Sequence, residues 1–283
     1  MNLLVVLIVL GFRQLGFAAE PAATVAALMR SWRDSWLTRG LREGWNGTVV
    51  LAFIVLPPAV LVAVGALLLG AIWHGVVLAL IALLVMLVVL LDRQRPDVLQ
   101  REQEGWLATT LETEAIASVG LLTLEIAADA ELTRARRALL EEQMHELFSP
   151  LFWLLLLGPI AATTYYFLRI SALAAASPAS DRARRLLEYA DWPASRVLSL
   201  TFALAGDFVA TWQHWRSNAL GAGVSAIALL DESAAAAQPV DLRMSTEDSP
   251  GAVLAAALTA IAALLHRGLV IWVVLLAVHT LWP

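Results

Sequence analysis

A run of 22 residues without a formal charge, Leu147 to Leu168, limits what this chain can fold into more than any other feature of its sequence. A helix needs about 20 apolar residues to cross the hydrocarbon core of a bilayer, so the run is long enough to span a membrane. A charged segment that contains Glu141, His145 and Glu146 directly precedes it. The join between a titratable helix and an apolar one is therefore the first place to look for a functional site.

The composition of the whole chain indicates a membrane protein and excludes several kinds of chemistry. Hydrophobic residues make up 60% of its 283 positions and charged residues 15%, outside the soluble globular range. All of its basic residues are arginines, so a lysine Schiff base is excluded. Because there is no cysteine, disulfides, thiol nucleophiles and thiolate metal sites are excluded as well. The net charge of −5 argues against a nucleic-acid partner, which requires a basic surface.

Hydrophobic segments separated by polar ones predict an all-α membrane protein. We expect about four transmembrane helices, with helical extramembrane regions and interfacial amphipathic helices. The chain then divides into N-terminal membrane-dipping and interfacial helices (1–47), a transmembrane hairpin (48–91), a polar helical region (92–146), a third transmembrane helix (147–171), a second polar and amphipathic helical region (172–250) and a C-terminal transmembrane helix (251–283). We expect the apolar stretch 3–10 to be retained, because no positive residue precedes it as in a signal peptide.

Prolines and charges predict the shape of two of these spans. In the first span, 49–69, the pair Pro57-Pro58 should bend the helix, because a proline inside a helix removes a hydrogen bond. The last hydrophobic block is interrupted by His266-Arg267. Since an arginine at the centre of a span is costly, we expect this span to begin close to His266, with Arg267 at the membrane interface.

The polar regions also contain helix signals. A helix beginning at Glu20-Pro21 and rich in arginine and tryptophan either lies at the membrane interface or packs on the protein's own membrane domain. Ser177 and the proline after it predict a second helix start, since serine caps helices and proline suits their first turn. We expect Pro193 to end that helix and residues 231–250 to form a loop.

Two clusters of charged side chains are candidates for a site. Glu141 and His145 are four residues apart, so they can touch on a helix, as an acid–base pair, as two metal ligands or as part of a solvated face. The segment around Arg185, Asp191 and Arg196 is denser in charge. Its arginines can receive the phosphate or carboxylate groups of a ligand or of lipids, or they can pair with acids on the same helix.

Two stretches of this sequence resemble a known family. The run SPLFWLLLLGPIAATTYYFLR resembles the APLFW…G…YxFLR segment of AmpE, an inner-membrane protein encoded beside the AmpD amidase in β-lactamase regulation. The run LLEYADWPASRVLSLTFALAGDF is similar to that family's LDWxPxRL…YAL.G segment, with Asp191, Trp192 and Arg196 matching. The residues that carry the motifs structurally are Pro150, Phe152, Trp153 and Trp192.

AmpE is itself similar to the cobalamin-pathway amide synthases of the CobD/CbiB type, which carry the motifs ENxxDGxxAPLFW, YKxxNTLDSM and RLDDxxNxxPARL. Glu141 matches the glutamate of the first motif, but His145 replaces an aspartate of that motif and Asp191 replaces an asparagine of the third. The second motif reads YYFLRISALA here and lacks its asparagine and aspartate. The resemblance therefore implies the fold of these enzymes without their ATP-dependent ligation.

The resemblance implies a multi-pass regulatory or sensory protein of the bacterial cytoplasmic (inner) membrane, linked to an AmpD-type amidase in cell-wall recycling and β-lactamase induction. We expect a site for a small anionic ligand at the membrane surface, with no catalytic residue or metal ligand assigned. Its members would be Glu141, His145, Arg185, Asp191 and Arg196. Two alternatives stay open: a diverged membrane ligase or transferase acting on a phosphorylated or tetrapyrrole-like substrate, and a docking partner of another membrane protein. A nucleotide or a tetrapyrrole is the candidate cofactor.

Overall fold

Helices form all the regular structure in the part of the chain that the computed structural model describes, which is residues 19–70, 102, 104–105, 121–219, 221, 223–238 and 250–281. The chain divides into two units. Unit 1 comprises Met1–Arg93, His145–Ala194 and Val273–Pro283, and unit 2 comprises Gln94–Met144 and Ser195–Trp272. The predicted all-helical class is confirmed for these residues.

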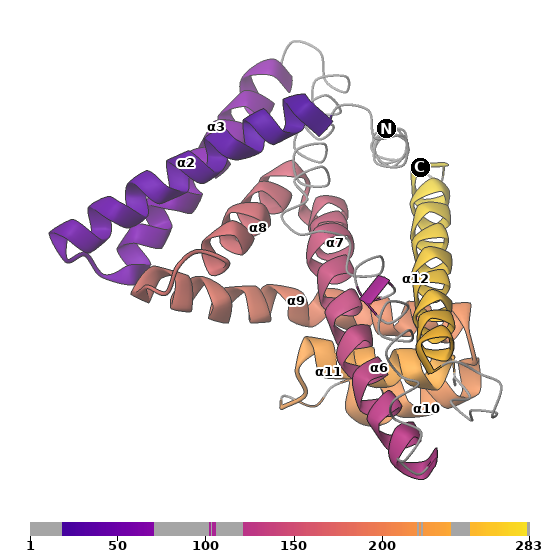
Figure 1. The fold of residues 1–283 in the computed structure, drawn as a ribbon. Coiled ribbons are helices and arrows are strands. Elements are labelled where there is room, and N and C mark those ends of the chain that lie inside the picture. Colours follow the sequence, from indigo (N-terminus) through magenta and orange to yellow (C-terminus); the bar gives the residue numbers. More distant parts are fainter. Residues whose placement is uncertain are drawn as a thin grey trace. The chain divides into compact units, whose positions relative to one another are not determined.

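Unit 1 is built around two pairs of helices. The first pair, α2 (Ala19–Glu43) and α3 (Gly47–Gly70), runs antiparallel through a short turn in which Gly44 has a φ of +68° (Figure 1). The second pair is α7 (Ser149–Leu157) and α8 (Pro159–Ala172), which follow the π-helical turn η2 (Met144–Phe148). The unit also contains the first part of α9 (Pro178–Ala205) and the end of α12 (Pro250–Leu281).

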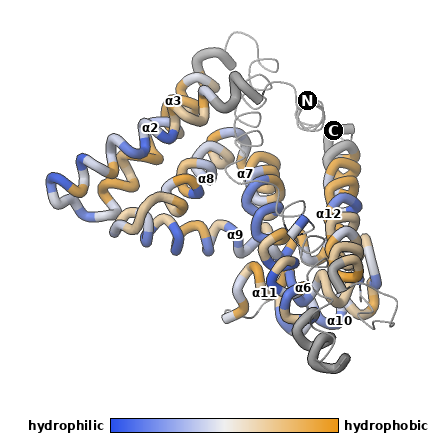
Figure 2. Tube along the Cα trace, viewed as in Figure 1, coloured by the Kyte–Doolittle hydropathy of each residue, from blue (hydrophilic) through white to orange (hydrophobic). Residues whose placement is uncertain are grey.

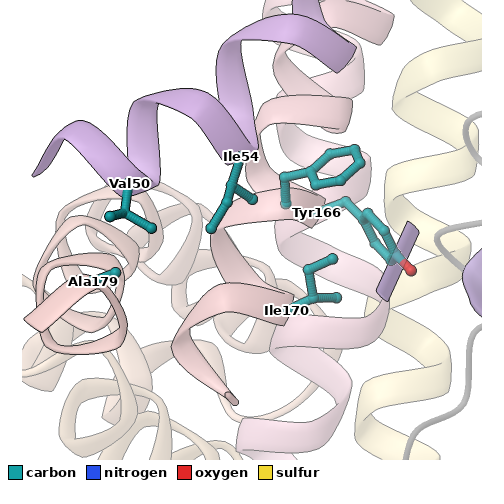
Figure 3. Packing of buried hydrophobic residues seen from close by; sticks show 6 residues of the cluster. Val50, Ile54, Tyr166, Ile170 and Ala179 are labelled. Atoms are coloured by element: carbon teal, nitrogen blue, oxygen red, sulfur yellow. The ribbon is translucent and has the colours of Figure 1, made fainter. Parts of the chain in front are cut away.

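The core of unit 1 lies between α3 and α8. Val50 and Ile54 of α3 pack against Tyr166 and Ile170 of α8 and against Ala179 at the start of α9 (Figure 3). All five residues are almost fully buried. The start of α3 is also held close to α9, because a Cβ at Gly47 would stand 2.4 Å from the carbonyl oxygen of Pro178. Only glycine fits at that approach.

The charge-free run differs from the single span that the sequence predicts, because it forms two helices that fold back on each other. α7 ends at Gly158, whose φ of +80° lies in the region that only glycine adopts readily. Pro159 then starts α8 and disfavours helical geometry at the residue before it. The two helices pack against each other and form a helical hairpin, with Gly158 at its tip (Figure 1). Main-chain bonds from Gly158 N to Leu154 O and from Ala162 N to Gly158 O continue through the tip.

α2 packs along the protein's own helices, as one of the two readings of its arginine- and tryptophan-rich sequence expects. Trp32 donates its indole N–H to the carbonyl of Ile54 on α3, at 3.3 Å. Arg33 donates to the carbonyl of Ile170 at the end of α8, at 2.7 Å. Ala26 is completely buried in this contact. α2 is therefore a structural part of unit 1.

The prediction that Pro193 ends its helix is wrong, because α9 continues to Ala205. A proline inside a helix leaves a carbonyl of the preceding turn without its usual donor. Here that carbonyl belongs to Tyr189, and the indole N–H of Trp153 donates to the neighbouring carbonyl of Ala190 at 3.2 Å, which joins α9 to α7. The start of α9 agrees with the sequence: Ser177 and Ser180 exchange side-chain to main-chain hydrogen bonds of 2.8 and 3.1 Å as a reciprocal cap.

Unit 2 contains α6 (Leu121–Gln143), the rest of α9, α10 (Phe208–Asn218), α11 (Ala226–Ala237) and most of α12 (Pro250–Leu281). Its strongest polar contact is Asp231 of α11, which pairs with Arg136 at 2.5 Å and with Arg137 at 2.7 Å. The predicted loop 231–250 is thus wrong for its first seven residues, which continue α11. The alanine-rich segment is helical because Ser225 caps it and Asp231 anchors it to α6. Residues 239–249 lie outside the described part.

Among the described residues, two helices are long and apolar enough to cross a membrane, α3 over Gly47–Leu67 and α12 over Ala252–Leu275 (Figure 2). Only 22% of the apolar window in α3 and 33% of that in α12 is buried, whereas a core helix would be mostly buried. α12 is one continuous helix from Pro250 to Leu281, and the expectation that its membrane span begins close to His266 stays a prediction. The Arg267 side chain is exposed and donates to Gln238 Oε1 at 2.9 Å, so it does not interrupt the helix. The predicted span 72–91 lies outside the described residues.

Replacing Gly158 with alanine tests the hairpin tip. No atom lies within 4 Å of the position of a new Cβ, so the cost is backbone strain alone. We expect Gly158→Ala to lower the free energy of unfolding by about 1 kcal/mol, measured by unfolding in detergent. Gly223→Ala, which also meets no atom but needs no positive φ, should be neutral or slightly stabilising. Equal stability of the two variants would contradict the tip geometry.

Candidate functional site

The π-helical turn between α6 and α7 turns two titratable side chains toward the hairpin. π-helical geometry is rare and often occurs at functional sites, because its wider turn shifts the residues that follow it around the helix axis. Here it spans Met144–Phe148 and contains His145 and Glu146. A helical wheel drawn at the α period puts His145 on the solvated face. In the structure, 22% of the His145 side chain is exposed and Glu146 is buried.

The centre of the site is the carboxylate of Asp191 on α9. Its Oδ1 accepts hydrogen bonds from the hydroxyls of Ser149 (2.7 Å) and Tyr165 (2.8 Å). Its Oδ2 lies 2.9 Å from Nε2 of His145. An ionised carboxylate is purely an acceptor, so Nε2 carries the proton in this contact. These four residues, which we call the Asp191 centre, join the π-helical turn, α7, α8 and α9.

The burial of the Asp191 centre limits its chemistry. Asp191 is 3% exposed and Tyr165 2%, and Ser149 is fully buried. The two hydroxyl groups donate to Asp191 and are shielded from solvent, so neither is available as a nucleophile. His145 is the only member with appreciable exposure. Its second ring nitrogen, Nδ1, has no hydrogen-bond partner among the described residues. The arrangement can therefore hold a proton or contact a ligand at that nitrogen.

A second buried polar pair closes the base of the hairpin. Arg169 of α8 donates to Glu146 Oε1 at 3.0 Å, and both side chains are more than nine-tenths buried. Such a pair is stable only when both charges stay together, because an unpaired buried charge costs several kcal/mol. One guanidinium nitrogen, Nη1 of Arg169, is buried and has no hydrogen-bond partner within the described part of the chain. Arg169 thus keeps one N–H group that can donate a hydrogen bond to an anionic or carbonyl oxygen.

The structure brings together only two of the five predicted site residues, His145 and Asp191. Arg185 is exposed on α9, within unit 1. Glu141 is exposed on α6, in unit 2, and does not pair with His145 as the spacing suggests. Arg196, also in unit 2, is buried and donates to the carbonyls of Ala219 (2.9 Å) and Val224 (3.1 Å). Burial lowers the pKa of its guanidinium from the ordinary value.

Four further residues of the site were missed in the sequence reading. Ser149 and Tyr165 are polar side chains inside a run that was read as a lipid-spanning helix, and Glu146 and Arg169 stand at its two ends. Ser149 also takes the place of the alanine in the APLFW motif, which was the one available signal. The motif residues have structural roles. Pro150 lies in the first turn of α7, and Phe152 and Trp153 form an edge-to-face pair. Trp192 differs from them, because 40% of its surface is exposed.

A metal site receives no support from the geometry. Within the described residues, no group of three or more His, Asp or Glu side chains is arranged to hold a metal ion. Comparisons of the chain with protein-family models, with curated proteins and with solved structures gave no match. The case for a function therefore depends on the residues and their contacts.

Substituting Asp191 tests whether the centre holds the hairpin. In Asp191→Asn the amide N–H faces the N–H of His145, so we expect a loss of about 2 kcal/mol in the free energy of unfolding. Tyr165→Phe, which removes one donor, should cost about 1 kcal/mol and should not add simply to Asp191→Asn. The matched control is Asp181→Asn, which alters the exposed pair with Arg184 and should change stability by less than about 1 kcal/mol. If Asp191→Asn and Asp181→Asn have the same free energy of unfolding in detergent, the Asp191 centre does not stabilise the hairpin.

Proposed function

We propose that this chain is an AmpE-like regulatory or sensory protein of the bacterial inner membrane, which binds an anionic ligand and acts in β-lactamase induction and cell-wall recycling. Its two apolar helices with exposed surfaces support the membrane location. The resemblance of the hairpin and α9 sequences to AmpE supports the pathway. The observation that carries the proposal is His145, anchored to a buried carboxylate through one nitrogen and partly exposed at the rest of its ring.

The proposal assigns a membrane topology that differs from four simple spans. α3, the segment 72–91 and α12 cross the bilayer, whereas the α7–α8 hairpin enters and leaves it on one side. Leu156, Leu157 and Ile160 around the hairpin tip are exposed and apolar, which suits contact with lipid. The polar Asp191 centre and the Glu146–Arg169 pair lie at the other end of the hairpin. Unpaired main-chain groups are costly at membrane depth, and two hydrogen bonds at the tip, from Gly158 N to Leu154 O and from Ala162 N to Gly158 O, reduce this cost.

In this proposal the protein detects the ligand through its contact with the Asp191 centre. Asp191 fixes the orientation of His145, and the partly exposed edge of the imidazole ring is where the ligand makes contact. The unpaired donor of Arg169 offers a second contact for an anion. Since the same carboxylate holds α7, α8 and α9 together, a ligand that changes its hydrogen bonds also changes how firmly the hairpin is held. This is a binding and signalling mechanism and requires no bond to be broken.

Gene disruption followed by complementation tests the proposed function. Loss of the gene should alter β-lactamase induction when cells are challenged with a β-lactam, and the wild-type gene should restore the response. His145→Ala should fail to restore it while accumulating in the membrane like the wild type, because it removes the exposed imidazole. Asp181→Asn is the control and should restore it fully. An unaltered response after disruption would overturn the proposal.

A catalytic role is the second candidate, and the His145–Asp191 contact favours it. A carboxylate that fixes one nitrogen of an imidazole leaves the other to act as a general base or acid. The candidate reaction is that of a diverged CobD/CbiB-like ligase or transferase with a phosphorylated or tetrapyrrole-like substrate. Turnover of ATP by the purified protein that disappears in His145→Ala would establish it. No turnover with ATP, and no ligand detected by mass spectrometry in the purified protein, would leave the regulatory role.

A further inference from the structure

An apolar groove of about 610 Å³ lies between α2, α3 and α8 in unit 1. Met29 and Trp32 of α2 form one wall, Pro57 and Leu61 of α3 the second, and Tyr166 and Phe167 of α8 the third. Its volume is typical of sites that bind small organic molecules. Leu28 and Leu61 remain 71% and 74% exposed along it, so the groove is open to its surroundings. None of its lining residues belongs to the Asp191 centre.

The groove continues into a charged pocket of about 540 Å³ on the same helix. The two share Trp32 and Ser35, and the second is also lined by Arg39, Arg42 and Glu43. Two arginines against one glutamate leave this pocket with a net positive charge. Arg39 stacks on Trp36 at 5.4 Å and lies 3.7 Å from Glu43. Arg42 is exposed and forms no ion pair with any described residue.

This combination fits a molecule with an apolar tail and an anionic head. Covering the exposed apolar surface of a groove with hydrocarbon is favourable. α3, which forms one wall, is a candidate membrane span, so the hydrocarbon at hand is a lipid acyl chain. Guanidinium groups bind phosphate through paired N–H donors. Tryptophans such as Trp32 and Trp36 are typical at the depth of lipid headgroups.

We propose that the groove and the adjoining pocket bind one anionic phospholipid of the surrounding bilayer. An acyl chain occupies the groove between α2, α3 and α8, and the phosphate group lies at Arg39 and Arg42. This lipid site is separate from the ligand site at His145 and does not depend on the proposed signalling role. It does depend on the protein being in a membrane.

Native mass spectrometry of the purified full-length chain, titrated with phosphatidylglycerol or with phosphatidylcholine of the same acyl chains, tests this proposal. The wild type should retain the anionic lipid several-fold more than the zwitterionic one. Arg39→Gln combined with Arg42→Gln should reduce retention of phosphatidylglycerol to the level of phosphatidylcholine. The matched control is Arg182→Gln with Arg216→Gln, which removes two exposed arginines that line neither the groove nor the pocket and should keep the preference.

The acyl-chain half of the site is tested by filling the groove. Leu61→Trp should reduce retention of both lipids, whereas Leu67→Trp, on an exposed part of α3 outside the groove, should not. Circular dichroism checks folding, and Val62→Phe fills the same groove if Leu61→Trp does not fold. Equal retention of the two lipids by the wild type would overturn the proposal. So would full retention in the groove-filling variants, or equal losses in the control variants.

Discussion

The carboxylate of Asp191 is the interaction on which the organisation of unit 1 depends. It accepts hydrogen bonds from the π-helical turn, from α7 and from α8 while belonging to α9. Without those three donors a carboxylate that is 3% exposed would be too costly to bury. With them, it joins both helices of the apolar hairpin to a third helix. The orientation of His145, and therefore any chemistry at its exposed edge, follows from this contact.

Helix α8 lies between the Asp191 centre and the apolar groove and contributes side chains to both. Tyr165 donates to Asp191, and the next two residues, Tyr166 and Phe167, line the groove. The same helix is packed against α3 through Tyr166 and Ile170. Since all of these contacts lie within unit 1, an event at either site acts on a helix that forms part of the other. Helix α8 therefore contributes residues to both the Asp191 centre and the groove.

The parts of the fold that depend on local composition were predictable, and those that depend on distant contacts were not. Length and hydropathy predict α3, and the Ser177 cap predicts the start of α9. The π-helical turn shifts His145 from the position that a helical wheel at the α period gives it, which is why the spacing of Glu141 and His145 suggested a contact that the structure does not contain. The Gly158-Pro159 pair was a visible break signal, but the apolar run around it suggested one span. The contact of His145 with Asp191 joins residues 46 apart, and no pattern in a single sequence indicates such a pairing.

The charge-free run turns back at Gly158, and in the proposed topology both of its ends therefore lie on one side of the membrane. Because the chain has no cysteine, single cysteines at Glu141 and Ala176, both exposed, report on the two ends separately. Intact cells whose outer membrane has been removed and inverted membrane vesicles are labelled with a membrane-impermeant maleimide. We expect Glu141→Cys and Ala176→Cys to react in the same preparation and to be protected in the other. Labelling of the two positions from opposite sides would mean that the run spans the bilayer and would contradict the hairpin.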